Sequence, residues 1–235
     1  YHNKFIKIFY NVLRVKHCTF VVKKHIIKSM KKILCYGDSN TYGYIPETFG
    51  RYTKNERWTG ILSELLSPEY EILEQGMNNR TGFFKNPENI KLCGGEYLPI
   101  YLQNHKDIDI CILALGTNDS QYFYNLDKNS ATAGLKHLVQ TIRDANSQTK
   151  ILIIPPVKIQ KNILDGIFAM QFDLNSVEKI KNVFPIFKKV SEEMNCFYLD
   201  LNEFVTPSPV DGLHYSKESH KIIAQILANF IKTNI

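Results

Sequence analysis

The 235-residue sequence has no run of about 18 apolar residues, so it does not predict a membrane-spanning helix. Its five cysteines have no zinc-type spacing, and no H-x-x-x-H pattern occurs. The nucleotide-binding patterns G-x-x-x-x-G-K-[ST] and G-x-G-x-x-G are also missing. We therefore expect neither a metal nor a cofactor. The odd number of cysteines, with Cys35, Cys111 and Cys196 in or beside apolar runs, favours buried free thiols in a reducing, cytoplasmic setting.

Acidic residues are absent from residues 1–29, which contain seven Lys or Arg. The rest of the chain holds 22 basic and 23 acidic residues, so the leader carries all of the net charge of +6 and the body predicts no nucleic-acid partner. The leader precedes the first methionine, Met30, and charged residues interrupt each apolar core that a signal peptide would need. We expect residues 1–29 to be non-native or dispensable, with a targeting segment as the alternative, and residues 30–235 to form the domain.

Residues 30–235 alternate between strand-length apolar runs and segments of helical periodicity. The predicted strands are Ile33–Tyr36, Glu71–Glu74, Ile108–Leu115, Ile151–Ile154 and Cys196–Leu199. The predicted helices are roughly Trp58–Leu66, Tyr97–Asn104, Ala131–Ala145, Val177–Met194 and Lys217–Lys232. Continuous apolar runs suit strands that are buried on both faces, so the pattern predicts one α/β domain with a parallel sheet.

Three further features of this pattern lead to local predictions. Ser130 and Ser176 are plausible N-caps of the predicted helices Ala131–Ala145 and Val177–Met194. The connection Pro155–Asn175, which contains Phe168, has no clear period. We interpret it either as a lid or pocket wall or as an unrecognised helix.

Polar residues follow the predicted strands, at the edge where an open parallel sheet binds ligands. Ser39 follows the first strand, Gly76 the second and Asn118 the third, and a loop near the chain's end holds Asp211 and His214. A serine hydroxyl becomes a nucleophile when a histidine accepts its proton and a carboxylate orients that histidine. The resulting oxyanion needs fixed hydrogen-bond donors. Each of these residues by itself is equally typical of a turn or a helix cap.

The order and spacing of these short motifs resemble a known family. "GDSN", "G76…N79", "GTND" and "DGLH" are similar to the four sequence blocks of the SGNH (GDSL-type) hydrolases. The stretches "RYTKNERWTGIL", "EILEQGMNNRTG" and "SPVDGLHYSKESH" look like the arylesterase-like branch, which acts on short-chain acyl esters. The resemblance covers roughly Lys31 to the C-terminus. It implies a single three-layer α/β/α domain with a flavodoxin-like parallel sheet of five strands.

The resemblance also implies the role of each residue. Ser39 is the nucleophile, His214 the general base and then the acid, and Asp211 the residue that orients His214. The oxyanion donors are the N–H groups of Ser39 and Gly76 and the side-chain amide of Asn118. Further candidates for substrate contact are Asp38, Asn79, Arg80, Trp58 and Phe168.

The function expected from the sequence is a metal-independent serine esterase for small acyl esters. A thioesterase, lysophospholipase or carbohydrate deacetylase with the same triad is the alternative, and a non-catalytic flavodoxin-like binding domain is a third. The intact Ser–His–Asp set counts against the third. The sequence leaves open the acyl group, the alcohol, hydrolysis against acyl transfer, and whether the chain forms a homo-oligomer.

Overall fold

The computed structural model describes residues 30–85 and 89–235; the leader, with Cys18, lies outside the described residues. Five parallel strands form one sheet in the order β2-β1-β3-β4-β5. The strands are β1 (Lys31–Gly37), β2 (Tyr70–Gly76), β3 (Ile110–Ala114), β4 (Lys150–Ile154) and β5 (Phe197–Tyr198). The prediction of a five-stranded parallel α/β fold is therefore confirmed.

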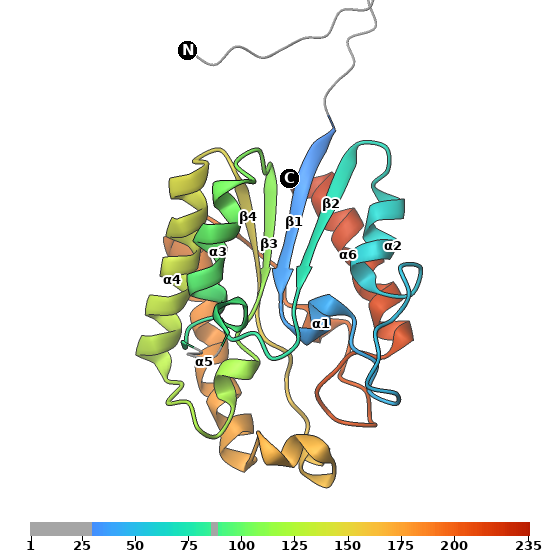
Figure 1. Ribbon diagram of the computed structural model, residues 1–235, viewed down its shortest axis with the longest axis vertical. Helices are drawn as coiled ribbons and strands as arrows, with labels where there is room; N and C mark the ends of the chain where they lie inside the picture. The colour runs from blue at the N-terminus through green and yellow to red at the C-terminus, as the bar shows by residue number, and fades with distance from the viewer. Residues whose placement is uncertain (1–29, 86–88) are drawn as a thin grey trace, which may run out of the picture.

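Helices cover both faces of the sheet and produce three layers (Figure 1). On one face lie α3 (Gly94–Gln103), α4 (Lys128–Ala145) and α5 (Leu174–Glu193). On the other lie α2 (Trp58–Leu65) and α6 (Lys217–Asn234). Each face of the sheet packs against its helices through a buried apolar cluster, which explains why the central strands β1, β3 and β4 contain continuous apolar runs.

The start of two helices differs from the sequence-based prediction. Asp127 and Asp173, not Ser130 and Ser176, are the N-caps of α4 and α5. Each aspartate accepts a hydrogen bond from the N–H of the serine three residues later, and that serine's hydroxyl bonds back to the N–H of the cap. A serine at the third helical position completes a capping box as well as it starts a helix, so the predicted helices began three residues too late.

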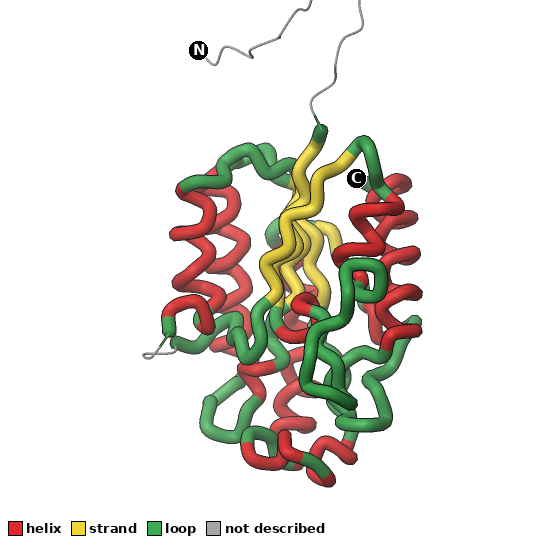
Figure 2. Tube along the Cα trace, turned by 45° about the vertical axis from the view of Figure 1, so that its right-hand side comes forward, coloured by secondary structure: helices red, strands yellow, loops and turns green. Residues whose placement is uncertain are grey.

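The carboxyl ends of the strands meet at one end of the molecule, where α1 (Ser39–Tyr42) follows β1 (Figures 1 and 2). Gly37 is level with Gly76 of β2 and with Ala114 of β3. The strand order reverses direction between β1 and β3, so this end contains the crevice that open α/β sheets use for ligands. The Pro155–Asn175 connection lies at the same end and contains two short 3-10 helices, η3 (Lys161–Asp165) and η4 (Ile167–Met170).

Candidate active site

Ser39 is the first residue of α1 and is held in a sharp turn from strand to helix. Asp38 caps this short helix by accepting the N–H of Asn40 at 2.9 Å. A side chain at Gly37 would place its Cβ 2.0 Å from the Thr41 hydroxyl oxygen and 2.7 Å from the carbonyl oxygen of Ala114. Only glycine fits this position, at the end of β1, where the chain turns into α1 and Ser39 follows.

Ser39, His214 and Asp211 form a hydrogen-bonded triad. The hydroxyl oxygen of Ser39 is 2.9 Å from Nε2 of His214, and Nδ1 of His214 is 2.6 Å from Oδ2 of Asp211. All three side chains belong to buried residues. The structure thus brings together the three residues that the sequence analysis assigned to proton transfer, although 175 positions separate Ser39 from His214.

Asp211 is prepared to remain ionised beside the histidine. Its second oxygen, Oδ1, accepts the backbone N–H groups of Leu213 and His214, each at 2.9 Å. Burial by itself would raise the pKa of Asp211, but the hydrogen bond and charge of His214, together with the two backbone donors, hold that pKa below its ordinary value. A carboxylate in this state fixes the imidazole's orientation and stabilises the imidazolium form.

Asn40 joins the serine turn to the histidine loop, a role that the sequence analysis did not assign. Its side-chain amide donates to the carbonyl of Leu213 at 3.2 Å, and its side-chain oxygen accepts the N–H of Tyr215 at 2.9 Å. The two bonds grip the residues on either side of His214. An asparagine next to a serine is too common to reveal this clamp, because the partner loop is known only after folding.

The predicted oxyanion donor Asn118 is buried beside the turn that follows β2. Its side-chain N–H donates to the carbonyl of Arg80 at 3.1 Å, and its side-chain oxygen accepts from Gln121 at 3.3 Å. The neighbouring Asp119 accepts the N–H groups of Gly82 and Phe83 at 2.6 and 2.7 Å. Two adjacent residues after β3 therefore hold the turn that contains residues 80–83.

Asp119 is completely buried. Burial raises the pKa of this carboxyl to about 6, and the backbone N–H donors offset only part of that rise. Its partners Gly82 and Phe83 lie 37 and 36 positions away, so the sequence by itself does not reveal this role.

The other oxyanion candidate, Gly76, ends β2 and packs directly on α1. A Cβ there would lie 2.1 Å from the backbone nitrogen of Tyr42, so this position also requires glycine. The last ladder bond to β1 comes from the N–H of Met77, which donates to Gly37. The turn continues to Asn79, which is exposed and has a φ of +61°.

Arg80 lies beneath the crevice and its charged group points inward. The guanidinium donates to the carbonyls of Lys91, Gly37 and Gln75 and lies over the ring of Tyr36. The residue is 2% exposed. Its side chain therefore clamps the ends of β1 and β2 from below, and the sequence-based expectation of substrate contact has no support from this placement.

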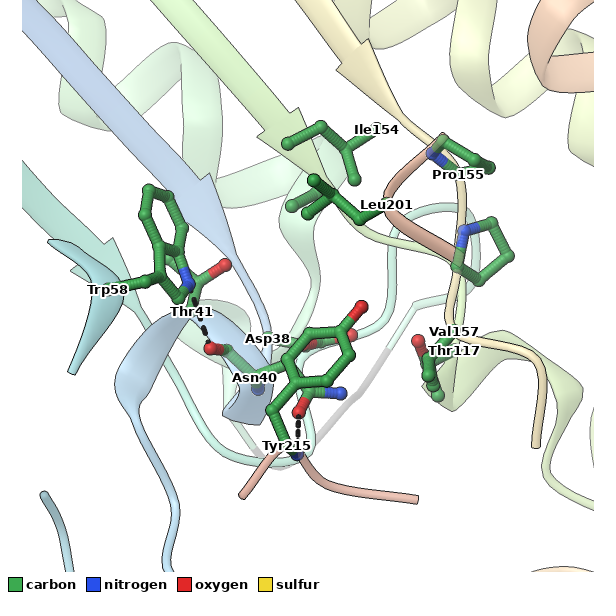
Figure 3. A pocket seen from close by; sticks show the side chains of 12 residues that line it. Asp38, Asn40, Thr41, Trp58, Thr117, Ile154, Pro155, Val157, Leu201 and Tyr215 are labelled. Atoms are coloured by element: carbon green, nitrogen blue, oxygen red, sulfur yellow. Dashed lines mark hydrogen bonds between the residues drawn. The ribbon is translucent and has the colours of Figure 1, made fainter. Parts of the chain in front are cut away.

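Trp58 and Asp38 line a small cavity at the carboxyl end of β1 (Figure 3). The cavity has about 20 Å³ of room for the centre of a water molecule, enough for one. The indole N–H of Trp58 donates to the carbonyl of Asn40 at 3.0 Å, and Tyr215 lines the other side. Burial raises the pKa of Asp38, against the opposing effect of hydrogen bonds from the N–H of Asn40 and from Thr117. These side chains support the serine turn from within.

Aromatic rings pack against the imidazole of His214. The ring centroid of Tyr44 is 4.3 Å from that of His214, and the centroid of Phe168 is 5.1 Å from it. Phe168 belongs to η4, so the Pro155–Asn175 connection does provide a wall of the site, as one of the two interpretations of this segment expected.

The remaining histidines and cysteines lie away from the triad's hydrogen bonds. His220 is fully buried and accepts the N–H of Trp58; its pKa is lowered to about 3 by burial and by the charge of His214. Cys35 and Cys111 are buried free thiols and Cys196 is a half-buried one. Within the described ranges, no three His, Cys, Asp or Glu side chains are arranged to hold a metal ion. None of the helices in those ranges is long and apolar enough to span a membrane.

Comparison with known proteins gives a consistent result. The model of the GDSL-like Lipase/Acylhydrolase family matches residues 35–222. One solved structure is 32% identical, with a TM-score of 0.79, over 87% of this chain and 98% of its own. A carbohydrate acetylesterase from Sinorhizobium meliloti is 26% identical, with a TM-score of 0.77, over 87% of this chain and 100% of its own.

An aryl esterase from M. smegmatis shares the fold, at 24% identity and a TM-score of 0.79, over 87% of this chain and 100% of its own. None of the curated protein sequences compared with the chain matches it.

Proposed function

Because the chain belongs to the GDSL-like lipase/acylhydrolase family, we propose that it hydrolyses small carboxylic esters through an acyl-enzyme on Ser39. The observation that carries this proposal is the unbroken chain of hydrogen bonds from Ser39 through His214 to Asp211. Membership of the family supports ester hydrolysis in general. The size of the acyl group and the roles of the individual residues are part of the proposal.

In the first half of the reaction, Ser39 attacks the acyl carbon while Nε2 of His214 takes the hydroxyl proton. The bond to the alcohol then breaks, and the same imidazole gives its proton to the departing oxygen. In the second half, a water molecule attacks the acyl-serine with His214 again as base, which releases the acid and restores Ser39. Asp211 stays ionised throughout and stabilises the imidazolium.

The negative oxygen that forms in each half needs donors, and three groups are available near Ser39. These are the N–H of Ser39 itself, the side-chain amide of Asn118 and an N–H from the turn after β2. Gly76 is the residue that we expected in the third role. Asn79 in the same turn is an alternative, since its left-handed conformation reorients the local backbone and, within the described residues, its N–H has no hydrogen-bond partner.

Two other reactions of the same triad are alternatives. Deacetylation of a carbohydrate has the support of the Sinorhizobium meliloti relative, which is named a carbohydrate acetylesterase. Transfer of the acyl group to an alcohol instead of water would use the same acyl-enzyme, and exclusion of water by the aromatic wall would favour it.

Replacement of the nucleophile tests the mechanism. In Ser39→Ala, kcat for p-nitrophenyl acetate should fall about 10⁴- to 10⁶-fold. A fluorophosphonate should label the wild type at Ser39 but not this variant. Ser191→Ala is a matched control, because Ser191 is also a buried serine, and among the described residues its hydroxyl bonds only to the carbonyl of Lys188 in α5. Turnover retained in pure Ser39→Ala protein would refute the acyl-enzyme mechanism.

A series of p-nitrophenyl esters of increasing acyl length tests the substrate size. We expect kcat/KM to decline beyond about eight acyl carbons, although each buried CH₂ could otherwise contribute about 0.8 kcal/mol. The reason is that η3 and η4 of the 155–175 connection lie at the crevice end of the sheet, where they limit the room for a long acyl chain. A steady rise of kcat/KM to long chains would instead indicate a lipase.

A further inference from the structure

Phe49 has an unusual backbone conformation for its size. Its φ is +61°, in the left-handed region that glycine and asparagine tolerate and bulky residues avoid. The side chain is 60% exposed, so burial of its ring in this protein offsets little of that cost. Strained residues that are held in place by their surroundings often have a function.

The turn that carries Phe49 is fixed at its base. The N–H of Phe49 donates to the carbonyl of Ile45 at 2.9 Å, and the N–H of Ile45 donates to Gly50 at 3.1 Å. Tyr44 and Arg51 pair as an antiparallel bridge. Arg51 donates hydrogen bonds to the carbonyl of Tyr42 in α1 and to the carboxylate of Glu74 in β2. The ring of Phe49 is therefore presented by a rigid support.

Phe49 continues the aromatic wall of the site outward. Its ring centroid is 6.4 Å from that of Tyr44, whose ring contacts both His214 and, edge-on at 6.1 Å, Phe168. The rings of His214, Tyr44 and Phe49 form a row from the catalytic imidazole to the surface. An apolar group that leaves the imidazole along this row would meet Phe49 last.

The position of the row beside His214 identifies the part of the substrate that meets it. His214 delivers its proton to the oxygen of the alcohol, so the alcohol portion of the ester must lie on the imidazole's side of the reacting carbon. The acyl portion stays on Ser39. The row of rings is thus next to the alcohol and not next to the acyl chain.

We propose that Phe49 is a specificity-determining residue that stacks against the alcohol portion of the ester and selects alcohols that carry an apolar ring. This inference rests on the proposed function and adds to it the residue that recognises the leaving group. A rigid aromatic side chain suits the role, since ring contacts add to the ordinary gain from burial and little freedom is lost on binding.

The test compares benzyl acetate with methyl acetate, which give the same acyl-enzyme and differ only in the alcohol. Phe49→Gly and Phe49→Asn remove the ring and both accept a positive φ, so their melting temperatures should equal or exceed that of the wild type. In both variants the ratio of kcat/KM for benzyl acetate to that for methyl acetate should fall about 3- to 10-fold. Hydrolysis of methyl acetate should change little.

Phe204→Ala is the control for loss of an exposed ring, because Phe204 is 50% exposed and, among the described residues, belongs to none of these ring contacts. Its ratio should match the wild type. A ratio within twofold of the wild type in both Phe49 variants would overturn the proposal. An equal loss for both esters would also overturn it, since the turn would then act on the triad and not on the alcohol.

A binding measurement separates this proposal from the proposed function. In Ser39→Ala protein, which has no nucleophile, the dissociation constant of benzyl alcohol should rise about 3- to 10-fold when Phe49→Gly is added. An unchanged dissociation constant would overturn the role of Phe49. If the wild type hydrolyses neither ester and Ser39 takes no label, the proposed function fails, whatever the result for benzyl alcohol.

Discussion

Two loops at the carboxyl end of the sheet each bury an aspartate, and the pKa values of the two carboxyl groups are shifted in opposite directions. Asp211 faces His214 and has a lowered pKa, whereas Asp119 faces backbone N–H groups and has a pKa raised to about 6. Each accepts two backbone N–H groups in good geometry. Asp119 is also the more deeply buried of the two, at 0% exposure against 7%, so the difference lies both in burial and in the partner that can itself become charged.

The contrast suggests different roles for the two aspartates: Asp211 assists proton transfer, and Asp119 positions a neighbouring turn. Fixed dipoles offset part of the cost of dehydrating a carboxylate, and a partner that can become a cation offsets more. In the proposed mechanism, a proton passes to and from His214 in the loop of residues 211–214. The loop of residues 118–120 holds the neighbouring turn in place and needs no cation to do so. Substitutions in the two loops should consequently have effects of different kinds as well as sizes.

The largest effect is expected from Asp211→Asn, which should lower kcat for p-nitrophenyl acetate about 10⁴-fold. The amide would donate to Nδ1 and leave the proton on Nε2, where the imidazole could no longer accept one from Ser39. Asp165→Asn, a change of an exposed carboxylate, should leave kcat unchanged. A loss of less than tenfold in Asp211→Asn would mean that the two aspartates differ less than their pKa values indicate.

A smaller loss is expected from Asn118→Ala, in the second loop. If its amide turns from the carbonyl of Arg80 to the oxyanion, kcat should fall about 10²- to 10³-fold with KM little changed, or roughly 2.7–4 kcal/mol of transition-state stabilisation. Steady-state kinetics on the same ester measure this, with the exposed Asn129→Ala as control. An unchanged kcat would show that the loop of residues 118–120 only positions the turn.

The smallest effect on catalysis, and the clearest on stability, is expected from Asp119→Asn. The folded state holds the Asp119 proton up to about pH 6, whereas the unfolded chain loses it near the ordinary value of 3.8. The folded state therefore binds more protons between these values, and this group's contribution of about 3 kcal/mol is present at low pH and lost as the pH rises through 6.

Urea unfolding at several pH values between about 4 and 7 measures that contribution. His220 acts in the opposite direction over this range, since its pKa is lowered to about 3, but it is common to wild type and variant and cancels in the comparison. The free energy of unfolding of Asp119→Asn should rise more steeply with pH than that of the wild type, by up to about 1.4 kcal/mol per pH unit. Parallel curves would contradict the assignment.

The outline of the site could be predicted because parallel strands bring their carboxyl ends to one edge. Residues that follow different strands, such as Ser39 and Asn118, must then lie near each other whatever the helices do. The loop with His214 was recognisable by its aspartate three positions earlier. These features depend on the order of elements along the chain, which the sequence displays directly.

The other features of the site could not be predicted, because they depend on contacts between segments that are far apart in the sequence and share no motif. The clamp from Asn40, the partners of Asp119 and the contact of Phe168 with His214 each join distant loops. A polar or aromatic residue in a loop has many potential partners, and packing decides among them. The predicted first residue of α4 was wrong for a local reason. Asp127 and Ser130 can both cap a helix, and only the backbone conformation shows that Asp127 is the cap.

The separation of 175 positions between Ser39 and His214 has a kinetic consequence. The two residues come from opposite ends of the described chain, and they meet only when β1 has found β3 and the final loop has docked on Asn40. Contacts so distant in sequence form slowly, because a large loop must close before it gains any stabilisation. Recovered esterase turnover after dilution from denaturant should therefore lag behind the recovery of helical circular dichroism.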